Sequence, residues 1–459
     1  MKAVKLAAGL LQVLSIVISS AVLVQLPSMI HVEAHQAALD HHSRGVIREL
    51  YLDSDAFLIA ETGEIQPLSQ VAYGGGYHVV VYVKENKDQF ESIHATVIPG
   101  QDNGHFEYYP ISSHALDCAH PAIAYHASNG FFIIVYSHHQ KEIYAQVFSP
   151  TIGNIGPAVL ISEVEVDKDF PAIACNQLDD VCLVAYHQSG AHFKGRYVEL
   201  STEGIVNLSA VYDLFSAIEV DRPHLAWGRG QGTFLLAYNE QLASGEVRPT
   251  YTHVFDQDDP LAAEKLLHPS APVLPGGLFS PGYDALVTDA VFDPCTKKFV
   301  LTIDYDAAGN GHNFDLLAAV VDAIDPIIHG VFPIADSPAS EHGGAIRFIT
   351  ADHVLPACGA MDRLVVAYIN ADVGLMATEM RGNSNPTTPG YTIDPVDQHL
   401  VIANHTNMYQ TSSVFLSSSS QDSQVLVLYE RYFPFSTTND LWGQFFTVRI
   451  HTFLPLVMR

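Results

Sequence analysis

Short apolar segments bounded by turn residues recur along the chain at intervals of about fifty residues. Three of them, residues 121–136, 171–186 and 223–238, align closely, since each begins with a proline and ends with a tyrosine. A turn rich in glycine, asparagine or aspartate divides each segment into two short apolar strands. This pattern is typical of a β-hairpin.

A third apolar strand follows each hairpin, at residues 143–148, 193–200 and 250–255, and a weaker fourth run comes next, as at residues 158–162. Four antiparallel strands with short connections form the blade of a β-propeller. One blade alone would leave both of its faces apolar, so burial requires that the blades stack against one another.

The second strand of this repeat can be recognised at four more places, which end at Tyr82, Ile303, Tyr368 and Tyr429. Together with the three clear copies they make seven units. We therefore predict an all-β chain that forms a single β-propeller over residues 46–450, with seven four-stranded blades. A misread divergent unit would change the number of blades to six or eight.

The two ends of the repeat region suggest how the ring closes. The last blade supplies only three obvious strands, between Thr411 and Ile450, and a strand-like run at residues 46–60 is available to complete it. Completion would remove an exposed strand edge. The proline- and glycine-rich residues 259–282 contain no clear strand beyond residues 263–267, and we predict a long loop there between the fourth and fifth blades.

The N-terminus has the pattern of a secretory signal. Lys2 and Lys5 precede an apolar run at residues 6–26, and permissive residues lie ahead of His35, where cleavage would fall. An uncleaved anchor is the alternative, because the run is long enough to span a bilayer. Either way the propeller would be exported, as a secreted or cell-surface protein. The predicted organisation is a signal peptide at 1–34, a flexible mature N-terminus at 35–45, the propeller at 46–450 and a hydrophobic tail at 451–459.

The repeat itself resembles one found in secreted bacterial propeller proteins. Its order is proline, an apolar residue, Ala-Tyr, then apolar-Val-Tyr, then Ile-Tyr-x-Gln-Val and a glycine turn. The resemblance is strongest in blades two to four and looser elsewhere. Most of those proteins are uncharacterised, so the resemblance implies a fold and export but no chemistry.

The cysteines allow one specific prediction. Cys175 and Cys182 take the places that Tyr125 and Phe132 hold in the preceding blade, where two residues should face each other across the hairpin. In an exported protein this arrangement predicts a disulfide. Because the bridge closes a short loop, it should stabilise the fold by about 2–3 kcal/mol.

The other three cysteines are less constrained by the repeat. Cys295 and Cys358 lie in the first hairpins of neighbouring blades, where a bridge between blades is possible, and the sequence leaves this open. Cys118 precedes the second blade alone, and we expect it to be a buried free thiol.

The charge of the chain limits its partners. Fifty acidic residues against 22 basic ones give a net charge of −28. Such a surface repels nucleic acid and anionic membranes. Neutral sugars, cations and basic protein surfaces remain, although the acidity could also serve solubility alone. The oligomeric state is not indicated.

Polar residues gather on one predicted face of the propeller. The loops that lead into the inner strands and the loops between second and third strands should share that face. The candidate binding residues there are His120, His138, His139, Asp169, His187, Asp221, Arg222, Glu240, Asp304 and Glu430. Their residue types suit a divalent metal or paired-carboxylate chemistry on a sugar. Against both hypotheses, these positions recur with the repeat, and an aspartate before a strand commonly caps its own turn.

One loop is rich enough in oxygen ligands to suggest calcium. It contains Asp304, Asp306, Asn310 and Asp315, but it lacks the order of ligands of an EF-hand, so a polar hairpin loop is the alternative. No cofactor is firmly implied.

We therefore expect a secreted or cell-surface propeller that binds carbohydrate or protein on its loop-rich face. The alternative is an extracellular polysaccharide hydrolase or lyase that uses the carboxylates and histidines of that face. A repeat scaffold without a small ligand is a third hypothesis. Convergence of acids from several blades on one pocket would distinguish the enzyme from the other two.

Overall fold

The computed structural model describes residues 46–61, 69–85, 91–100, 106–112, 117–163, 168–176, 178, 180–188, 192–216, 223–244, 246–255, 271–273, 284–306, 314–335, 339–349, 363–383, 392–404, 414–419, 424–432 and 439–452. The chain divides into two units, Met1–Val46 with Thr452–Arg459, and Ile47–His451. The predicted signal peptide and flexible N-terminus lie outside the described residues. Within those residues, no helix has the length and apolar character needed to cross a membrane.

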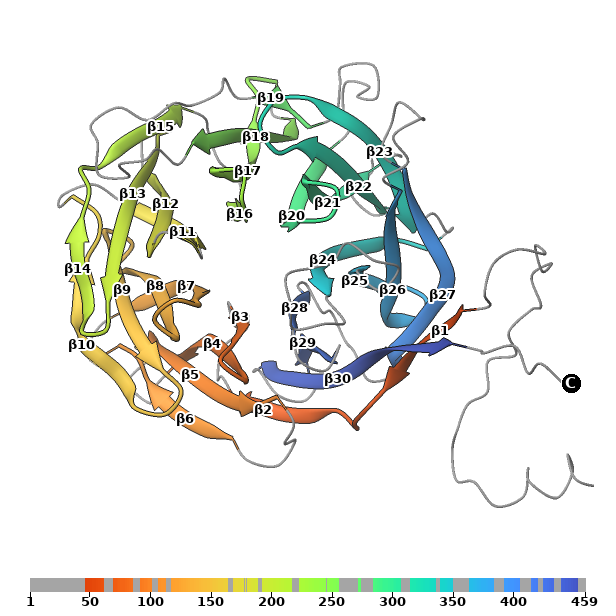
Figure 1. The fold of residues 1–459 in the computed structure, drawn as a ribbon, viewed down its shortest axis with the longest axis horizontal. Coiled ribbons are helices and arrows are strands. Elements are labelled where there is room, and N and C mark those ends of the chain that lie inside the picture. Colours follow the sequence, from red (N-terminus) through yellow and green to blue (C-terminus); the bar gives the residue numbers. More distant parts are fainter. Residues whose placement is uncertain are drawn as a thin grey trace, which may run out of the picture. The chain divides into compact units, whose positions relative to one another are not determined.

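The unit Ile47–His451 is a ring of seven antiparallel sheets around a central axis (Figure 1). The predicted seven-bladed β-propeller is therefore confirmed. In six blades the strands follow chain order from the inner to the outer edge of the sheet.

The first three blades have these strands: β3 (Ser69–Gly74), β4 (Tyr77–Glu85), β5 (Glu91–Pro99) and β6 (Glu107–Pro110) in blade 1; β7 (Cys118–His126), β8 (Phe131–His138), β9 (Glu142–Ser149) and β10 (Gly153–Leu160) in blade 2; β11 (Lys168–Asn176), β12 (Val181–Gln188), β13 (His192–Ser201), β14 (Gly204–Leu208) and β15 (Tyr212–Ser216) in blade 3. In blade 3 both β14 and β15 pair with β13.

The next three blades have these strands: β16 (His224–Gly228), β17 (Thr233–Gln241), β18 (Val247–Phe255) and β19 (Ala271–Pro272) in blade 4; β20 (Ala285–Asp293), β21 (Lys298–Asp306), β22 (Phe314–Asp322) and β23 (Ile328–Ala335) in blade 5; β24 (Glu341–Ile349), β25 (Arg363–Asn370), β26 (Gly374–Asn383) and β27 (Thr392–Asn404) in blade 6.

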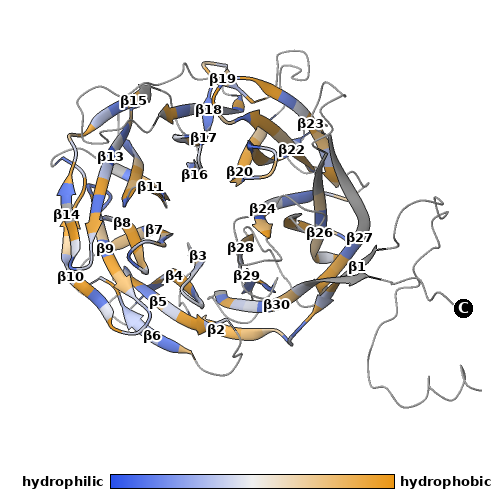
Figure 2. Ribbon diagram, in the orientation of Figure 1, coloured by the Kyte–Doolittle hydropathy of each residue, from blue (hydrophilic) through white to orange (hydrophobic). Residues whose placement is uncertain are grey.

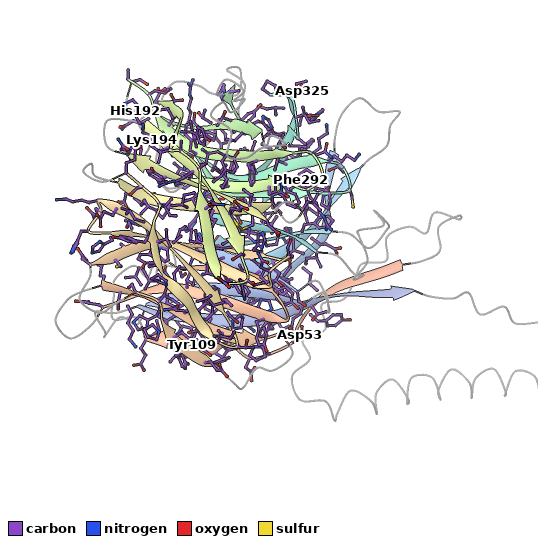
Figure 3. All side chains as sticks on the ribbon, turned by 60° about the vertical axis from the view of Figure 1, so that its left-hand side comes forward. Asp53, Tyr109, His192, Lys194, Phe292 and Asp325 are labelled. Atoms are coloured by element: carbon purple, nitrogen blue, oxygen red, sulfur yellow. A yellow bond between two sulfur atoms is a disulfide. The ribbon has the colours of Figure 1, made fainter. Side chains whose placement is uncertain are left out.

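Blade 7 joins the two ends of the propeller. It consists of β28 (Val414–Ser418), β29 (Gln424–Tyr432) and β30 (Asn439–Thr452), to which β1 (Val46–Leu52) and β2 (Phe57–Glu61) add from the N-terminal side. As predicted, the N-terminal run completes the last blade: Phe57 lies opposite Gly443 in the pairing of β2 with β30. Asp53, which is labelled in Figure 3, lies between the two N-terminal strands. It accepts a hydrogen bond from Thr447 and donates its backbone N–H to the carbonyl of Phe445 at 3.0 Å.

The hydrophobic core is divided among the junctions between blades. Seven clusters of buried residues occur in the described part of the chain, and each of them joins two neighbouring blades. The last joins Leu426 and Phe445 of blade 7 to Val71 and Val80 of blade 1, which closes the ring. Because each sheet packs on both faces, its second strand is apolar almost throughout, and Figure 2 shows apolar residues along the inner parts of the blades.

One part of the fold differs from the expectation. Within residues 259–282, predicted as a loop apart from 263–267, the fourth strand of blade 4 lies at Ala271–Pro272. This strand pairs only through Thr250 with Pro272 and Tyr251 with Ala271. Proline cannot donate to a strand ladder, which explains why the sequence pattern did not identify so short a strand. The predicted run at residues 263–267 lies outside the described residues.

The structure contains the predicted disulfide. Cys175 and Cys182 lie opposite each other in the pairing of β11 with β12, with their Cα atoms 3.9 Å apart. Cys118 is buried and outside any disulfide, as expected, and burial raises the pKa of its thiol to about 11. Cys358 lies outside the described residues, so the possible bridge to Cys295 stays open.

Candidate functional site

The pairing of each inner strand with the second strand defines the two faces of the propeller. Cys118, at the start of β7, lies opposite His138 at the end of β8, so the approach to the inner strand and the β8–β9 turn share one face. We call this the front face. The opposite face, which carries the turns between first and second strands, we call the back face.

The inner strands are irregular where they leave the front face. Bulges interrupt the pairing between Ala119 and Ala122 in β7 and between Asp169 and Ala172 in β11. Inside these bulges His120 and Phe170 have positive φ angles of 51° and 48°. A non-glycine residue in this region is strained, and such strain concentrates at functional sites.

The bulges bring three of the predicted binding residues together across blades 2 and 3. His120 contacts the carboxylate of Asp169 through Nδ1, and its ring centre lies 4.3 Å from that of Phe170. His187 lies opposite Asp169 in the pairing of β11 with β12. Burial lowers the pKa of His187 below its usual range, although the Asp169 carboxylate opposes this shift. We call His120, Asp169 and His187 the front-face cluster.

The other predicted residues of the front face contact near neighbours. His138 Nδ1 lies 3.0 Å from Glu142 Oε2, and the rings of His138 and His139 are 4.1 Å apart. Glu240 forms an ion pair with Arg248, with 2.8 Å between Oε2 and Nη2. These contacts do not extend to the front-face cluster.

The acids of blades 5 and 7 are buried. Asp304 accepts a hydrogen bond at 2.9 Å from the backbone N–H of Gly343 in the next blade. Asn239 has the corresponding place in blade 4 and likewise bonds the backbone of Val287 in blade 5, at 2.7 Å. This repeat position therefore connects neighbouring blades. Glu430 is 4% exposed. Asp221 and Arg222 lie outside the described residues.

The suggested calcium ligands are only partly described. Asp306 lies opposite Phe314 and Asp315 opposite Tyr305 in the pairing of β21 with β22, while Asn310 falls outside the described residues. Among the residues that are described, no group of three or more histidine, cysteine, aspartate and glutamate side chains could hold a metal ion. Calcium binding stays a prediction.

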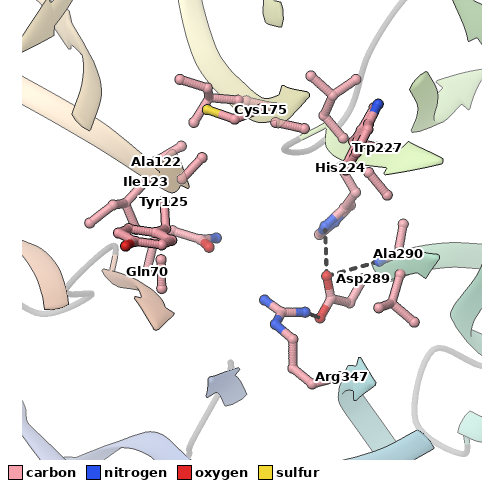
Figure 4. Close-up of a pocket in the computed structure, with 18 of the residues that line it drawn as sticks. Gln70, Ala122, Ile123, Tyr125, Cys175, His224, Trp227, Asp289, Ala290 and Arg347 are labelled. Carbon is pink, nitrogen blue, oxygen red and sulfur yellow. Dashed lines mark hydrogen bonds and ion pairs between the residues drawn. The ribbon is translucent and has the colours of Figure 1, made fainter. Parts of the chain in front are cut away.

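The inner strands of all seven blades line a channel with a cavity of about 540 Å³ (Figure 4). One position of these strands, level with the disulfide, carries a large side chain in most blades. The seven residues at this position are Tyr73, Tyr125, Cys175, Trp227, Phe292, Phe348 and Ser418. Five of them are aromatic, and four of the rings are only half-buried. We call these five side chains the aromatic ring of the channel.

A charged cluster lies beside the aromatic ring. Asp289 of β20 forms an ion pair with Arg347 of β24, and its carboxylate lies 3.8 Å from Nδ1 of His224 on β16. The three side chains are 14%, 24% and 16% exposed, respectively. Figure 4 shows them reaching toward one another from three consecutive blades.

The sequence pattern did not predict the charged cluster, because its residues lie within strands and not in the loops of the front face. His224 and Asp289 each lie three residues before the aromatic position of their strand, where Ala122 and Ala172 stand in blades 2 and 3. A histidine or aspartate in place of the alanine of the repeat is a signal that could have identified them. Such a deviation is not required by packing.

Likeness to known proteins is found among solved structures. No family model matches the chain, and the curated proteins contain no match. The polysaccharide lyase Uly1 is 10% identical over 90% of this chain and 94% of its own, with a TM-score of 0.47. Drosophila Plexin A in complex with Semaphorin 1b is 10% identical over 85% and 87%, with a TM-score of 0.48. The intramolecular trans-sialidase from Ruminococcus gnavus is 9% identical over 86% and 97%, with a TM-score of 0.45.

Proposed function

We propose that this protein is an exported carbohydrate-binding propeller that takes a saccharide into its central channel. The observation that carries the proposal is the lining of the cavity. The aromatic ring lies next to the hydrogen-bonding side chains of Gln70, His224 and Arg347.

This combination suits a sugar for a chemical reason. A pyranose has an apolar face of C–H groups, which packs against an aromatic ring, and a rim of hydroxyl groups, which need donors and acceptors. The cavity of about 540 Å³ also falls in the range of about 300–1,000 Å³ that is usual for small-ligand sites. A protein domain would not enter such a space, so the channel favours a saccharide over a protein partner.

Tryptophan fluorescence can test this proposal, because the chain has only two tryptophans. Trp227 belongs to the aromatic ring of the channel, whereas Trp442 lies on β30 under the guanidinium of Arg431, 5.0 Å from its ring centre. In the W442F variant the remaining emission comes from Trp227. Titration with neutral and acidic oligosaccharides should change this emission in a saturable manner.

The W227F variant is the matched control. It should keep the emission of Trp442, lose the response to sugar and bind about tenfold more weakly by calorimetry. If neither the emission of W442F nor calorimetry on the full chain responds to any oligosaccharide in the panel, the proposal is wrong.

A second candidate function rests on the front-face cluster. The carboxylate of Asp169 holds His120 through Nδ1, an arrangement that orients an imidazole to act as a base through Nε2. The low pKa of His187 keeps a second imidazole neutral beside it. This geometry is compatible with a polysaccharide hydrolase or lyase. New reducing ends in a polysaccharide incubated with the protein, and their loss in the H120A variant, would support the enzyme; binding without any cleavage would exclude it.

A further inference from the structure

The channel differs in charge from the rest of the chain. The whole chain has 50 acidic and 22 basic residues. By contrast, the lining of the channel, as far as the structure describes it, contains one carboxylate, Asp289, and two guanidinium groups, Arg229 and Arg347. A site with few carboxylates in a protein that is acidic as a whole is suited to an anionic ligand, because the lining repels it less than the rest of the surface does.

The one carboxylate in the lining is already satisfied by protein groups. Asp289 Oδ1 accepts the backbone N–H of Ala290 at 2.8 Å, and Oδ2 accepts the N–H of Ile346 at 3.0 Å as well as the guanidinium of Arg347. These donors compensate its charge. Asp289 therefore acts on Arg347 as a positioning residue, since it fixes the direction of the guanidinium.

Among the described residues, the contacts that hold Arg347 all go through one nitrogen. Nη1 donates to Asp289 and to the backbone carbonyl of Ile346 at 2.6 Å. The structure shows no protein acceptor for Nε or Nη2 within the part of the chain that it describes, and the side chain is 24% exposed. A guanidinium fixed at one nitrogen keeps a pair of parallel N–H donors, the geometry that binds a carboxylate through both of its oxygens.

We propose that the channel binds a saccharide that carries a carboxylate, a uronic acid, and that Arg347 contacts this carboxylate through two parallel hydrogen bonds. The proposal rests on the proposed function, because the aromatic ring is assigned to the sugar ring of the same ligand. The five aromatic residues favour a sugar acid over an acidic peptide, since a glutamate side chain offers no ring face to stack.

The experiment compares tetragalacturonate with its methyl ester, which keeps the sugar rings and removes the negative charge. Calorimetry on the full chain should show that the free acid binds at least about tenfold more tightly than the ester. In R347Q this preference should disappear, because the free acid should lose far more affinity than the ester. R347K keeps the charge without the paired donors and should retain only part of the preference.

Arg229 provides the matched control. It lines the same channel from the exposed turn between β16 and β17, so R229Q removes the same charge from the same lining. R229Q should keep the preference for the free acid. An equal loss in R229Q and R347Q would overturn the assignment to Arg347 and indicate a general effect of charge.

The remaining outcomes separate this inference from the proposed function. Equal binding of acid and ester, with the Trp227 emission changing in both titrations, would overturn the inference and leave the carbohydrate-binding proposal intact. No binding of either sugar or of neutral oligosaccharides would reject both. A tetraglutamate peptide that binds as tightly as the sugar acid would reject the saccharide. Circular dichroism of each variant checks that it folds.

Discussion

The ring of Tyr125 in blade 2 lies directly against Gly74 in blade 1. A Cβ atom on Gly74 would come within 2.0 Å of Cγ of that ring. Tyr125 also belongs to the aromatic ring of the channel, so the contact between these two residues sets the spacing of two blades at the channel wall. An aromatic side chain can occupy this position because the preceding blade presents bare backbone there.

Gly74→Ala should destabilise the propeller by about 1–3 kcal/mol, because the new methyl group displaces the Tyr125 ring from a packed site. Chemical denaturation measures the free energy of unfolding. In the Y125A background, which leaves room for the methyl group, the same substitution should cost clearly less. Equal costs in the two backgrounds would show that the two residues do not interact.

Removal of the disulfide should destabilise the protein without preventing folding. The double variant C175A/C182A should lose about 2–3 kcal/mol of unfolding free energy, since the bridge closes a loop with a sequence separation of 7. A reductant should lower the unfolding midpoint of the wild type and leave that of the double variant unchanged. A wild-type midpoint that is insensitive to reductant under denaturing conditions would contradict the bridge.

Asp322 should stabilise the fold in a pH-dependent manner. Burial by itself would raise the pKa of Asp322, but hydrogen bonds from Lys298, His329 and the backbone N–H groups of Ile324 and Asp325 outweigh it and lower the pKa well below its usual range. Because the folded-state pKa is depressed, the stabilisation is present above the unfolded-state value of about 3.8 and is lost as the pH falls below it.

The D322N variant checks this effect. It should be about 1–2 kcal/mol less stable than the wild type near pH 7, and the difference should shrink below about pH 4. Unfolding free energies measured across this pH range give the comparison. A difference that stays constant down to pH 2 would mean that the carboxylate charge is not the source of the stabilisation.

His78 should make the free energy of unfolding depend on pH in a higher pH range than Asp322 does. It is fully buried between blades 1 and 7, with Nδ1 2.5 Å from Ser417 Oγ, and burial lowers its pKa from 6.5 to about 3. Below pH 6.5 the unfolded chain takes up a proton at this residue that the folded chain does not. The contribution of His78 to the free energy of unfolding is therefore fully present above pH 6.5. It is lost as the pH drops toward 3, by at most about 1.4 kcal/mol per pH unit.

His78→Asn removes the titrating group and keeps a side chain that can bond Ser417. The variant should have a flatter dependence of unfolding free energy on pH between 6.5 and 4 than the wild type. Parallel profiles for the two proteins would show that His78 titrates alike in the folded and unfolded chains.

Much of the fold was predictable because the repeat is local in sequence. The seven predicted second strands are in equivalent register, since the residue four places before Tyr82 and the residue four places before Tyr429 lie opposite equivalent positions of their inner strands. The strands themselves continue past these two tyrosines, to Glu85 and Tyr432. The disulfide followed from this equivalence alone, since Cys175 and Cys182 replace a facing pair. The short strand β19 could not be predicted, because two paired residues leave no apolar pattern.

The candidate site was predicted only in part. The cluster of His120, Asp169 and His187 lay within the expected set, because loop residues of neighbouring blades must meet on one face. The charged cluster of the channel was not predicted, since Asp289 and Arg347 lie within strands, where the sequence pattern does not distinguish them from other sheet residues.

The sequence by itself determined the blade as the repeating unit, the register of the hairpins and the disulfide, since each depends on the pattern within one repeat. Only the tertiary structure decided which side chains share the channel. His224, Asp289 and Arg347 come from three blades, and they meet because seven sheets close into a ring and place their inner strands around one axis. Ring closure depends on packing between blades, which no single repeat encodes, and it is what turns three separate strand residues into one site.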